Sequence, residues 1–312
     1  MPESTRRPRA RQQQRWGGNP LEALAYLVAF PLLHGLARLP LAALYRLSDV
    51  AFFVIYRVLR VRRAVTRDNL RRSFPEAAPD ELARIEERCY RHQCDVAFEW
   101  LKLIAMSAEE IRERMRAKID VAWQLQARRQ SAIFVLGHCG NWEWAIPSAA
   151  LALHDVKLHV VYHPLRHARF DRLMRSVRGR FGGILTPMED APRAIVGLRH
   201  EVTATILVAD QRARSRNPYL TRFLGQETAF LRGPERLARS LGVPVVYVEV
   251  IRVGRGRYEM RTEWLCEDPS AMSEGEITER FVRRLEQQIL ETPEDWLWLH
   301  RRWRNRRAER GE

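Results

Sequence analysis

The residues of this sequence that best suit catalysis lie in the segment Gly137–Trp144, which reads GHCGNWEW. It holds an imidazole at His138 and a carboxylate at Glu143, five positions later. A carboxylate beside an imidazole fixes the tautomer of the ring and stabilises the imidazolium, so that the other ring nitrogen can take a proton. We therefore predict that His138 is a general base and that Glu143 is its partner.

The neighbouring residues of the segment fit the same chemistry. Gly137 and Gly140 would let the backbone approach a substrate closely and direct N–H groups at a developing oxyanion. Asn141 could cap a helix that begins at the next residue. No serine stands beside His138, and a strand-end turn would point Cys139 elsewhere, which favours direct general-base catalysis over a covalent intermediate.

The pattern of the chain predicts the scaffold for these residues, an α/β fold with a mainly parallel sheet. The apolar run Ser131–Leu136 is typical of a buried strand, and it would place His138 at the carboxyl end of that strand, where open α/β sheets form their sites. Residues 79–130 show helical spacing, most clearly over Asp80–Tyr90 and Ala108–Lys118. Further strands are expected over Val156–Tyr162, Val202–Val208 and Val243–Val253, and helices over Trp142–Leu153, Phe170–Phe181, Ala191–Leu198, Gly233–Leu241 and 276–291.

The N-terminal part divides into a basic arm and an apolar region. Residues 1–20 are polar and rich in arginine, and we expect a flexible arm there. Two apolar stretches follow, Leu21–Ala37 and Leu39–Ile55. We predict membrane-anchoring helices over residues 21–60, ahead of an α/β domain over residues 61–312. Helices that span the bilayer and a helix pair that lies in the interface both fit; a buried hairpin and a signal peptide are the competing interpretations.

Charge and composition limit the class of partner. Lys and Arg number 53 against 38 for Asp and Glu, and the net charge of +15 favours an acidic carrier protein, an anionic membrane surface or nucleic acid. Arginines are dense over residues 57–75, directly after the apolar stretches, which suits contact with anionic lipid.

With 46% hydrophobic residues the chain can bury a core, so full disorder is excluded. The four cysteines show no C-x-x-C spacing, which indicates neither a disulfide framework nor a zinc site and fits a reducing compartment.

Taken together, these motifs resemble those of the bacterial lipid A late acyltransferases, the lauroyl/myristoyl transferase family within the H-x4-D/E acyltransferases. GHCGNWEW resembles the first block of that family. The ordered match covers nearly all of residues 20–305. Its other pieces are Thr66–Glu76, Tyr162–Pro164 with Phe170–Gly182, Asp210 with Gln211, Phe223–Gly225 with Gly233, and the Trp/Arg-rich segment Trp296–Trp303.

The resemblance implies an N-terminal membrane anchor and an α/β acyltransferase domain at the cytoplasmic face of the bacterial inner membrane. The activity that it implies is transfer of a fatty acyl group from acyl carrier protein to a hydroxyl of a Kdo2-lipid IVA-type precursor of lipid A. Neither a metal nor an organic cofactor is implied, and nucleic acid is not an expected partner.

The resemblance also assigns residues to the site. His138 and Glu143 would be catalytic, and an arginine would bind a phosphate or carbonyl oxygen. Arginines at 172, 175, 178 and 180 leave the register of that residue ambiguous, with Arg178 the first choice and Arg180 its rival. The other substrate-binding residues would be Gly140, Asn141, Asp210 and Gln211.

Several alternatives stand beside this interpretation. The same chemistry could act on another acceptor, such as a glycerophospholipid, a mannolipid or an ornithine lipid, because pocket shape decides acceptor choice. The tryptophans of Trp296–Trp303 suit a membrane interface better than a nucleic-acid surface. Four histidines lie within His154–His167, but no acidic residue or cysteine joins them at metal-ligand spacing. A non-enzymatic basic binding protein is the alternative class, and it predicts that His138 and Glu143 are dispensable.

Overall fold

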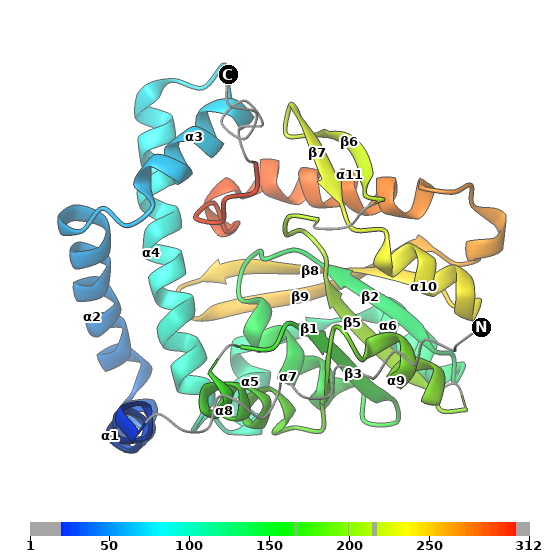
Figure 1. Cartoon of the computed structure of the whole chain (residues 1–312), viewed down its shortest axis with the longest axis horizontal. Coiled ribbons are helices and arrows are strands. Elements are labelled where there is room, and N and C mark those ends of the chain that lie inside the picture. The colour runs from blue at the N-terminus through cyan, green and yellow to red at the C-terminus, as the bar shows by residue number, and fades with distance from the viewer. Residues whose placement is uncertain (1–19, 166, 199, 214–216, 304–312) are drawn as a thin grey trace, which may run out of the picture.

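A seven-stranded sheet with strand order β1-β9-β8-β2-β5-β3-β4 forms the centre of the computed structural model, which describes residues 20–165, 167–198, 200–213 and 217–303 (Figure 1). Neighbouring strands are parallel except β8 and β9, which are antiparallel. The prediction of an α/β fold with a mainly parallel sheet is therefore confirmed, whereas residues 1–19 of the expected basic arm lie outside the described residues. The strands are β1 (Met115–Lys118), β2 (Ala132–Leu136), β3 (Lys157–Tyr162), β4 (Ile184–Pro187), β5 (Thr203–Val208), β8 (Val245–Gly254) and β9 (Arg257–Cys266), and a separate hairpin joins β6 (Tyr219–Phe223) to β7 (Gln226–Phe230).

Helices cover both faces of the sheet, and this explains why β2 is apolar throughout. Its side chains alternate between two hydrophobic clusters: Phe134 and Leu136 face helix α7, while Ile133 and Val135 face helix α11. The helices are α1 (Pro20–Ala37), α2 (Leu41–Phe52), α3 (Arg63–Ser73), α4 (Pro79–Leu103), α5 (Ala108–Arg114), α6 (Asp120–Ala127), α7 (Trp142–Ala152), α8 (Ala168–Gly179), α9 (Ala191–Gly197), α10 (Gly233–Leu241) and α11 (Glu276–Glu291), with a π-helix, η1, over Phe53–Val58 and short 3₁₀ turns at η2 (Pro269–Ala271) and η3 (Pro293–Asp295).

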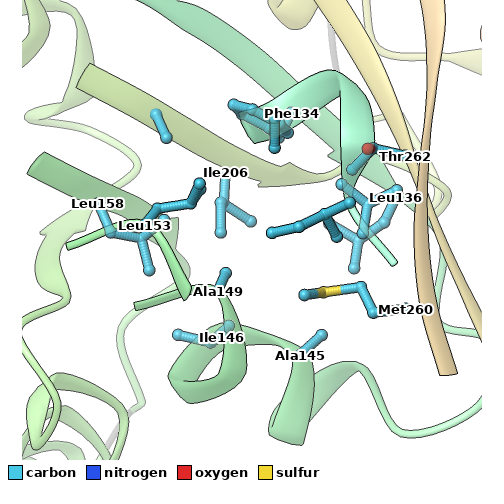
Figure 2. Close-up of a pocket in the computed structure, with 14 residues that line it drawn as sticks. Phe134, Leu136, Ala145, Ile146, Ala149, Leu153, Leu158, Ile206, Met260 and Thr262 are labelled. Carbon is cyan, nitrogen blue, oxygen red and sulfur yellow. The ribbon is translucent and has the colours of Figure 1, made fainter. Parts of the chain in front are cut away.

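A small cavity of about 20 Å³ lies between α7 and the sheet (Figure 2). Ala145, Ile146 and Ala149 line it from the helix side, and Ile206 and Met260 are among the strand residues opposite. Its volume matches a single water molecule and its walls are almost wholly apolar, so we expect it to be empty. The small alanine side chains let α7 lie close to the sheet and leave this gap.

The structure departs from the predicted elements at β1, and strands β4, β6, β7 and β9 were not predicted. Residues Met115–Lys118 were expected to be helical, yet they pair in parallel with Tyr258–Arg261 of β9 as the edge strand β1. This pairing overrides a sequence whose local preference is helical. Strand β9 is hard to predict because a charged residue stands at every second position from Arg257 to Glu263 and interrupts the apolar pattern.

The N-terminal helices pack against α4 on one side of the molecule (Figure 1). Ser48 of α2 donates a hydrogen bond to Asp95 of α4 at 2.7 Å, and Tyr45 donates one to Glu99 at 2.8 Å. Among the described residues, no helix combines the length and the apolar character that crossing a bilayer requires. Of the two membrane-bound arrangements expected, the spanning one therefore has no counterpart in the described helices.

Candidate active site

His138 and Asp210 meet because they follow two neighbouring strands in the same register. Leu136 of β2 pairs with Val208 of β5, and each of the two residues comes two positions later. The His138 Nδ1 donates to Asp210 Oδ1 at 2.5 Å, and the backbone N–H of His138 donates to Asp210 Oδ2 at 2.9 Å. The carboxylate that holds the imidazole is thus Asp210.

Hydrogen bonds around the ring define the tautomer of His138. Because Nδ1 donates its proton in the hydrogen bond to Asp210, Nε2 is unprotonated, and its lone pair accepts a hydrogen bond from the Gln211 side-chain amide at 3.2 Å. The ring of Trp142 contacts the imidazole edge-on, with 5.0 Å between ring centroids. His138 therefore presents a basic nitrogen at Nε2 and a fixed ring orientation.

Asp210 is buried and yet is held as a carboxylate. Burial by itself would raise its pKa, but the attraction of His138 and hydrogen bonds from His138 and Trp296 lower that pKa to about 2. Trp296 donates its indole N–H to Asp210 Oδ2 at 2.8 Å. A carboxylate of this kind stabilises the imidazolium that forms when Nε2 takes a proton.

The expectation that Glu143 orients His138 is wrong in this structure. Arg178 donates from Nη2 to Glu143 Oε1 at 2.5 Å and from Nε to Oε2 at 2.9 Å, so a bidentate ion pair occupies both carboxylate oxygens. Glu143 lies on the first turn of α7 and Arg178 on the last turn of α8, and at these positions each charge also interacts favourably with the dipole of its own helix. The first turn of α7 directs Glu143 toward α8, whereas Asp210, which follows the neighbouring strand β5, bonds to His138.

Gly140 and Asn141, both predicted to bind substrate, have structural contacts instead. Gly140 has a φ of +55° and donates its N–H to the Asp295 carbonyl at 3.1 Å, so that N–H is not directed at an oxyanion. Asn141 is fully buried; its Oδ1 accepts from the Trp144 N–H at 2.9 Å and its Nδ2 donates to Glu99 at 2.6 Å. The predicted helix cap at Asn141 is confirmed, and both placements argue against contact with a substrate.

Arg180 also serves the fold. Its Nη1 donates to three backbone carbonyls at and just after the end of α4, those of Leu103, Ile104 and Met106, at 3.3, 3.2 and 2.8 Å. Of the two rival arginines, the structure therefore joins only Arg178 to a residue of the GHCGNWEW segment.

Two of the three tryptophans near the C-terminus are buried, and Trp303 is partly exposed. Trp296 and Trp298 are 2% and 0% exposed, so the prediction that their rings sit at a membrane interface is wrong. The sequence singles out Trp296 as part of a Trp-rich segment after the last helix, but it does not predict that Trp296 belongs to the site.

The histidines within His154–His167 do not form a metal site. His159 hydrogen-bonds to Thr186, and the part of the chain that the structure describes holds no group of three or more His, Cys, Asp or Glu suited to a metal ion.

Comparisons with known proteins agree with the motif order. A family model for bacterial lipid A biosynthesis acyltransferases matches residues 17–305. Lipid A biosynthesis acyltransferase 2 of Shigella flexneri is 25% identical over 141 residues, which are 45% of this chain and 44% of that protein. Phosphatidylinositol mannoside acyltransferase of Mycolicibacterium smegmatis is 25% identical over 233 residues, 73% of this chain and 74% of that protein. The first alignment spans less than half of its relative, but the family model covers most of the chain, and the chain therefore belongs to the bacterial lipid A biosynthesis acyltransferase family of acyltransferase enzymes.

Proposed function

We propose that this protein transfers a fatty acyl group from acyl carrier protein to a hydroxyl of a Kdo2-lipid IVA-type acceptor. The observation that carries the proposal is the buried Asp210 carboxylate bound to Nδ1 of His138, which leaves Nε2 as a base. The Gln211 side-chain amide donates to that nitrogen, and in this proposal the acceptor hydroxyl replaces Gln211 as the donor. The net charge of +15 suits both an acidic carrier protein and a phosphorylated glycolipid.

The proposed reaction is direct attack on the thioester. His138 Nε2 takes the hydroxyl proton while the hydroxyl oxygen forms a bond to the thioester carbonyl carbon, and Asp210 stabilises the resulting imidazolium. The tetrahedral intermediate then collapses, the carbon–sulfur bond breaks, and the imidazolium returns its proton to the leaving thiolate. The products are the ester and the free thiol of the carrier, so protons and electrons balance.

Arg178 supplies positive charge in this proposal. Burial favours its neutral form, but the attraction and hydrogen bonds of Glu143, together with the attraction of Tyr162 and Asp171, raise the pKa of the Arg178 guanidinium. A guanidinium held in this way can stabilise the oxyanion or bind an acceptor phosphate. Glu143 then acts by fixing Arg178 in place.

A mannolipid is the second candidate acceptor. The relative that acts on phosphatidylinositol mannoside aligns over 73% of this chain, against 45% for the relative named for lipid A biosynthesis. Both acceptors offer a hydroxyl group, and the same His138 chemistry serves either one.

The decisive test measures transfer from labelled acyl carrier protein to Kdo2-lipid IVA and, separately, to phosphatidylinositol mannoside. His138→Asn is expected to lower kcat about 10²–10⁴-fold, the usual contribution of a positioned base. His154→Asn is the matched control, because His154 is exposed beyond α7 and should leave turnover unchanged. Near wild-type turnover of His138→Asn would refute the general-base assignment, and turnover with one acceptor only would identify the acceptor class.

We further propose that the protein docks on the cytoplasmic face of the bacterial inner membrane through an N-terminal apolar face. This face consists of exposed side chains on α1, α2 and η1 and at the residue after η1: Leu27, Val28, Leu32, Leu47, Val50, Phe53, Val58 and Leu59. Such a concentration of exposed apolar residues is typical of an interaction surface, and the exposed Arg46, Arg57 and Arg60 next to it favour anionic lipid.

Vesicle flotation tests the membrane proposal. Phe53→Ser with Leu59→Ser should reduce co-flotation with phosphatidylglycerol-containing vesicles, since both residues are about 60% exposed and would bury apolar area in the lipid. Leu290→Ser is the control, because Leu290 is 54% exposed on α11, outside the N-terminal apolar face. Equal flotation of all variants would show that another surface binds lipid.

A further inference from the structure

We propose that Trp296 is a positioning residue of the site, whose indole N–H fixes the Asp210 carboxylate in the orientation that His138 requires. The inference rests on the proposed function, because it concerns how the Asp210–His138 pair is made ready for acyl transfer. Trp296 acts through Asp210 and contacts no reacting atom.

Three donors hold the two oxygens of Asp210. Trp296 Nε1 and the His138 backbone N–H both reach Oδ2, at 2.8 and 2.9 Å, and the imidazole reaches Oδ1 at 2.5 Å. The two bonds to Oδ2 stop the carboxylate from rotating about its Cβ–Cγ bond and thereby aim Oδ1 at the ring. Because Asp210 is buried, a lost donor is not replaced by bulk water, and each donor carries more weight than it would at a surface.

The C-terminal segment that carries Trp296 is itself tied to the loop that carries His138. Trp296 forms an antiparallel bridge with Cys139, and the Asp295 carbonyl accepts the Gly140 N–H at 3.1 Å. One piece of chain thus contacts both members of the pair, Asp210 through a side chain and the His138 loop through its backbone. This connection links the last described segment of the chain to the carboxyl ends of β2 and β5.

The surrounding side chains hold the Trp296 indole in a single position. The Trp296 ring lies against Trp298, with 4.6 Å between centroids and a nearly perpendicular arrangement, and against Phe223 at 5.9 Å. The Asn69 side chain anchors the same segment by donating to the Trp298 carbonyl at 2.9 Å. An indole that is 2% exposed and enclosed in this way cannot swing away from Asp210 without disturbing the core.

Trp298 offers a matched comparison two residues away. It is 0% exposed, and its indole N–H donates to the Pro293 carbonyl at 2.6 Å, away from the site. Replacing either tryptophan by phenylalanine keeps an aromatic ring and removes one buried N–H. Only the Trp296 replacement removes a donor from Asp210.

The experiment compares Trp296→Phe with Trp298→Phe in the full chain, with transfer from acyl carrier protein as the assay. Loss of a hydrogen bond to a charged group should lower kcat of Trp296→Phe about 10- to 100-fold and leave KM for both substrates unchanged, because Trp296 touches neither. Trp298→Phe should retain kcat within about twofold, and thermal unfolding should show a similar loss of stability for both variants.

A second readout does not depend on turnover. With ¹⁵N-labelled histidine, the ring nitrogens of His138 should report a single tautomer with Nδ1 protonated in the wild type and in Trp298→Phe, and a mixture of tautomers in Trp296→Phe. His138→Asn assigns the resonance. A single tautomer together with wild-type kcat in Trp296→Phe would overturn the positioning role. If His138→Asn itself remains active, the proposed function fails instead, and the nitrogen shifts of Trp296→Phe still decide whether Trp296 positions the pair.

Discussion

Two carboxylates lie near His138 in the sequence or in space, and their contacts separate their roles. Asp210 bonds to the imidazole, whereas Glu143 is fully engaged by Arg178. Both Glu143 and Arg178 are largely buried, with side chains 10% and 17% exposed. Neither can lose its partner without leaving an unpaired charge in a poorly solvated place.

The ion pair gives a prediction for a double-mutant cycle. Glu143→Gln alone should lower the free energy of unfolding by about 3–5 kcal/mol, because Arg178 is left buried and unpaired. The double variant with Arg178→Gln should recover most of that loss, since both charges are gone. Urea unfolding of the four proteins measures the coupling, and strictly additive losses would contradict it.

At the scale of elements, the register of two parallel strands builds the site. Leu136 and Val208 pair across β2 and β5, and the backbone turns after each strand bring His138 and Asp210 to the same edge of the sheet. Gly140 completes the turn after β2. A Cβ at this position would lie 2.7 Å from the Val250 carbonyl oxygen of β8, in addition to the strain of its φ of +55°.

Gly140→Ala is therefore expected to destabilise the chain by about 1–3 kcal/mol, through strain and overpacking against β8. It should also lower kcat, because the loop that carries His138 must shift. Gly35→Ala in α1 provides the contrast: no neighbouring atom lies within 4 Å of the place that a Cβ would take, and alanine favours a helix by up to about 1 kcal/mol. Thermal unfolding of both variants checks the prediction, which fails if Gly140→Ala is as stable as the wild type.

At the scale of the whole molecule, segments distant in the sequence converge behind the site. Asp295 Oδ1 lies 3.9 Å from the imidazole Nε2 of His92 on α4 and 3.8 Å from the guanidinium Nη1 of Arg252 on β8. Burial is the main reason that the pKa of Asp295 rises to about 7, and the attraction of Arg252 only partly opposes it. A carboxyl with a raised pKa favours the folded state at low pH, and this contribution disappears as pH rises through about 7.

Asp295→Asn should remove that pH dependence. Between pH 5 and pH 8 the wild type should lose about 2–3 kcal/mol of stability relative to the variant, because the buried carboxyl ionises across this window. Urea unfolding at the two pH values measures the difference, and comparison with the variant cancels the titration of unrelated groups. An equal pH dependence of the two proteins would show that Asp295 does not titrate in this range.

The sequence by itself determined the local features. Apolar runs specified the central strands β2, β3, β5 and β8, because strands covered on both faces read as continuous hydrophobic segments. Helix α10 begins and ends where the periodicity predicts, and Asn141 caps α7 as expected. His138 could be placed at a strand end because the strand–glycine–helix order is local to one stretch of chain.

Only the tertiary structure decided which residues meet. Asp210 lies 72 residues from His138, and its place beside the imidazole depends on β5 being the neighbour of β2, which local pattern does not encode. Glu143 was the nearer candidate along the chain, but the start of α7 turns it toward Arg178 on α8. Trp296 reads as a surface residue by composition and is buried because α11 and the hairpin of β6 and β7 close over it. Partners in space follow from strand order and packing, and these are properties of the folded chain as a whole.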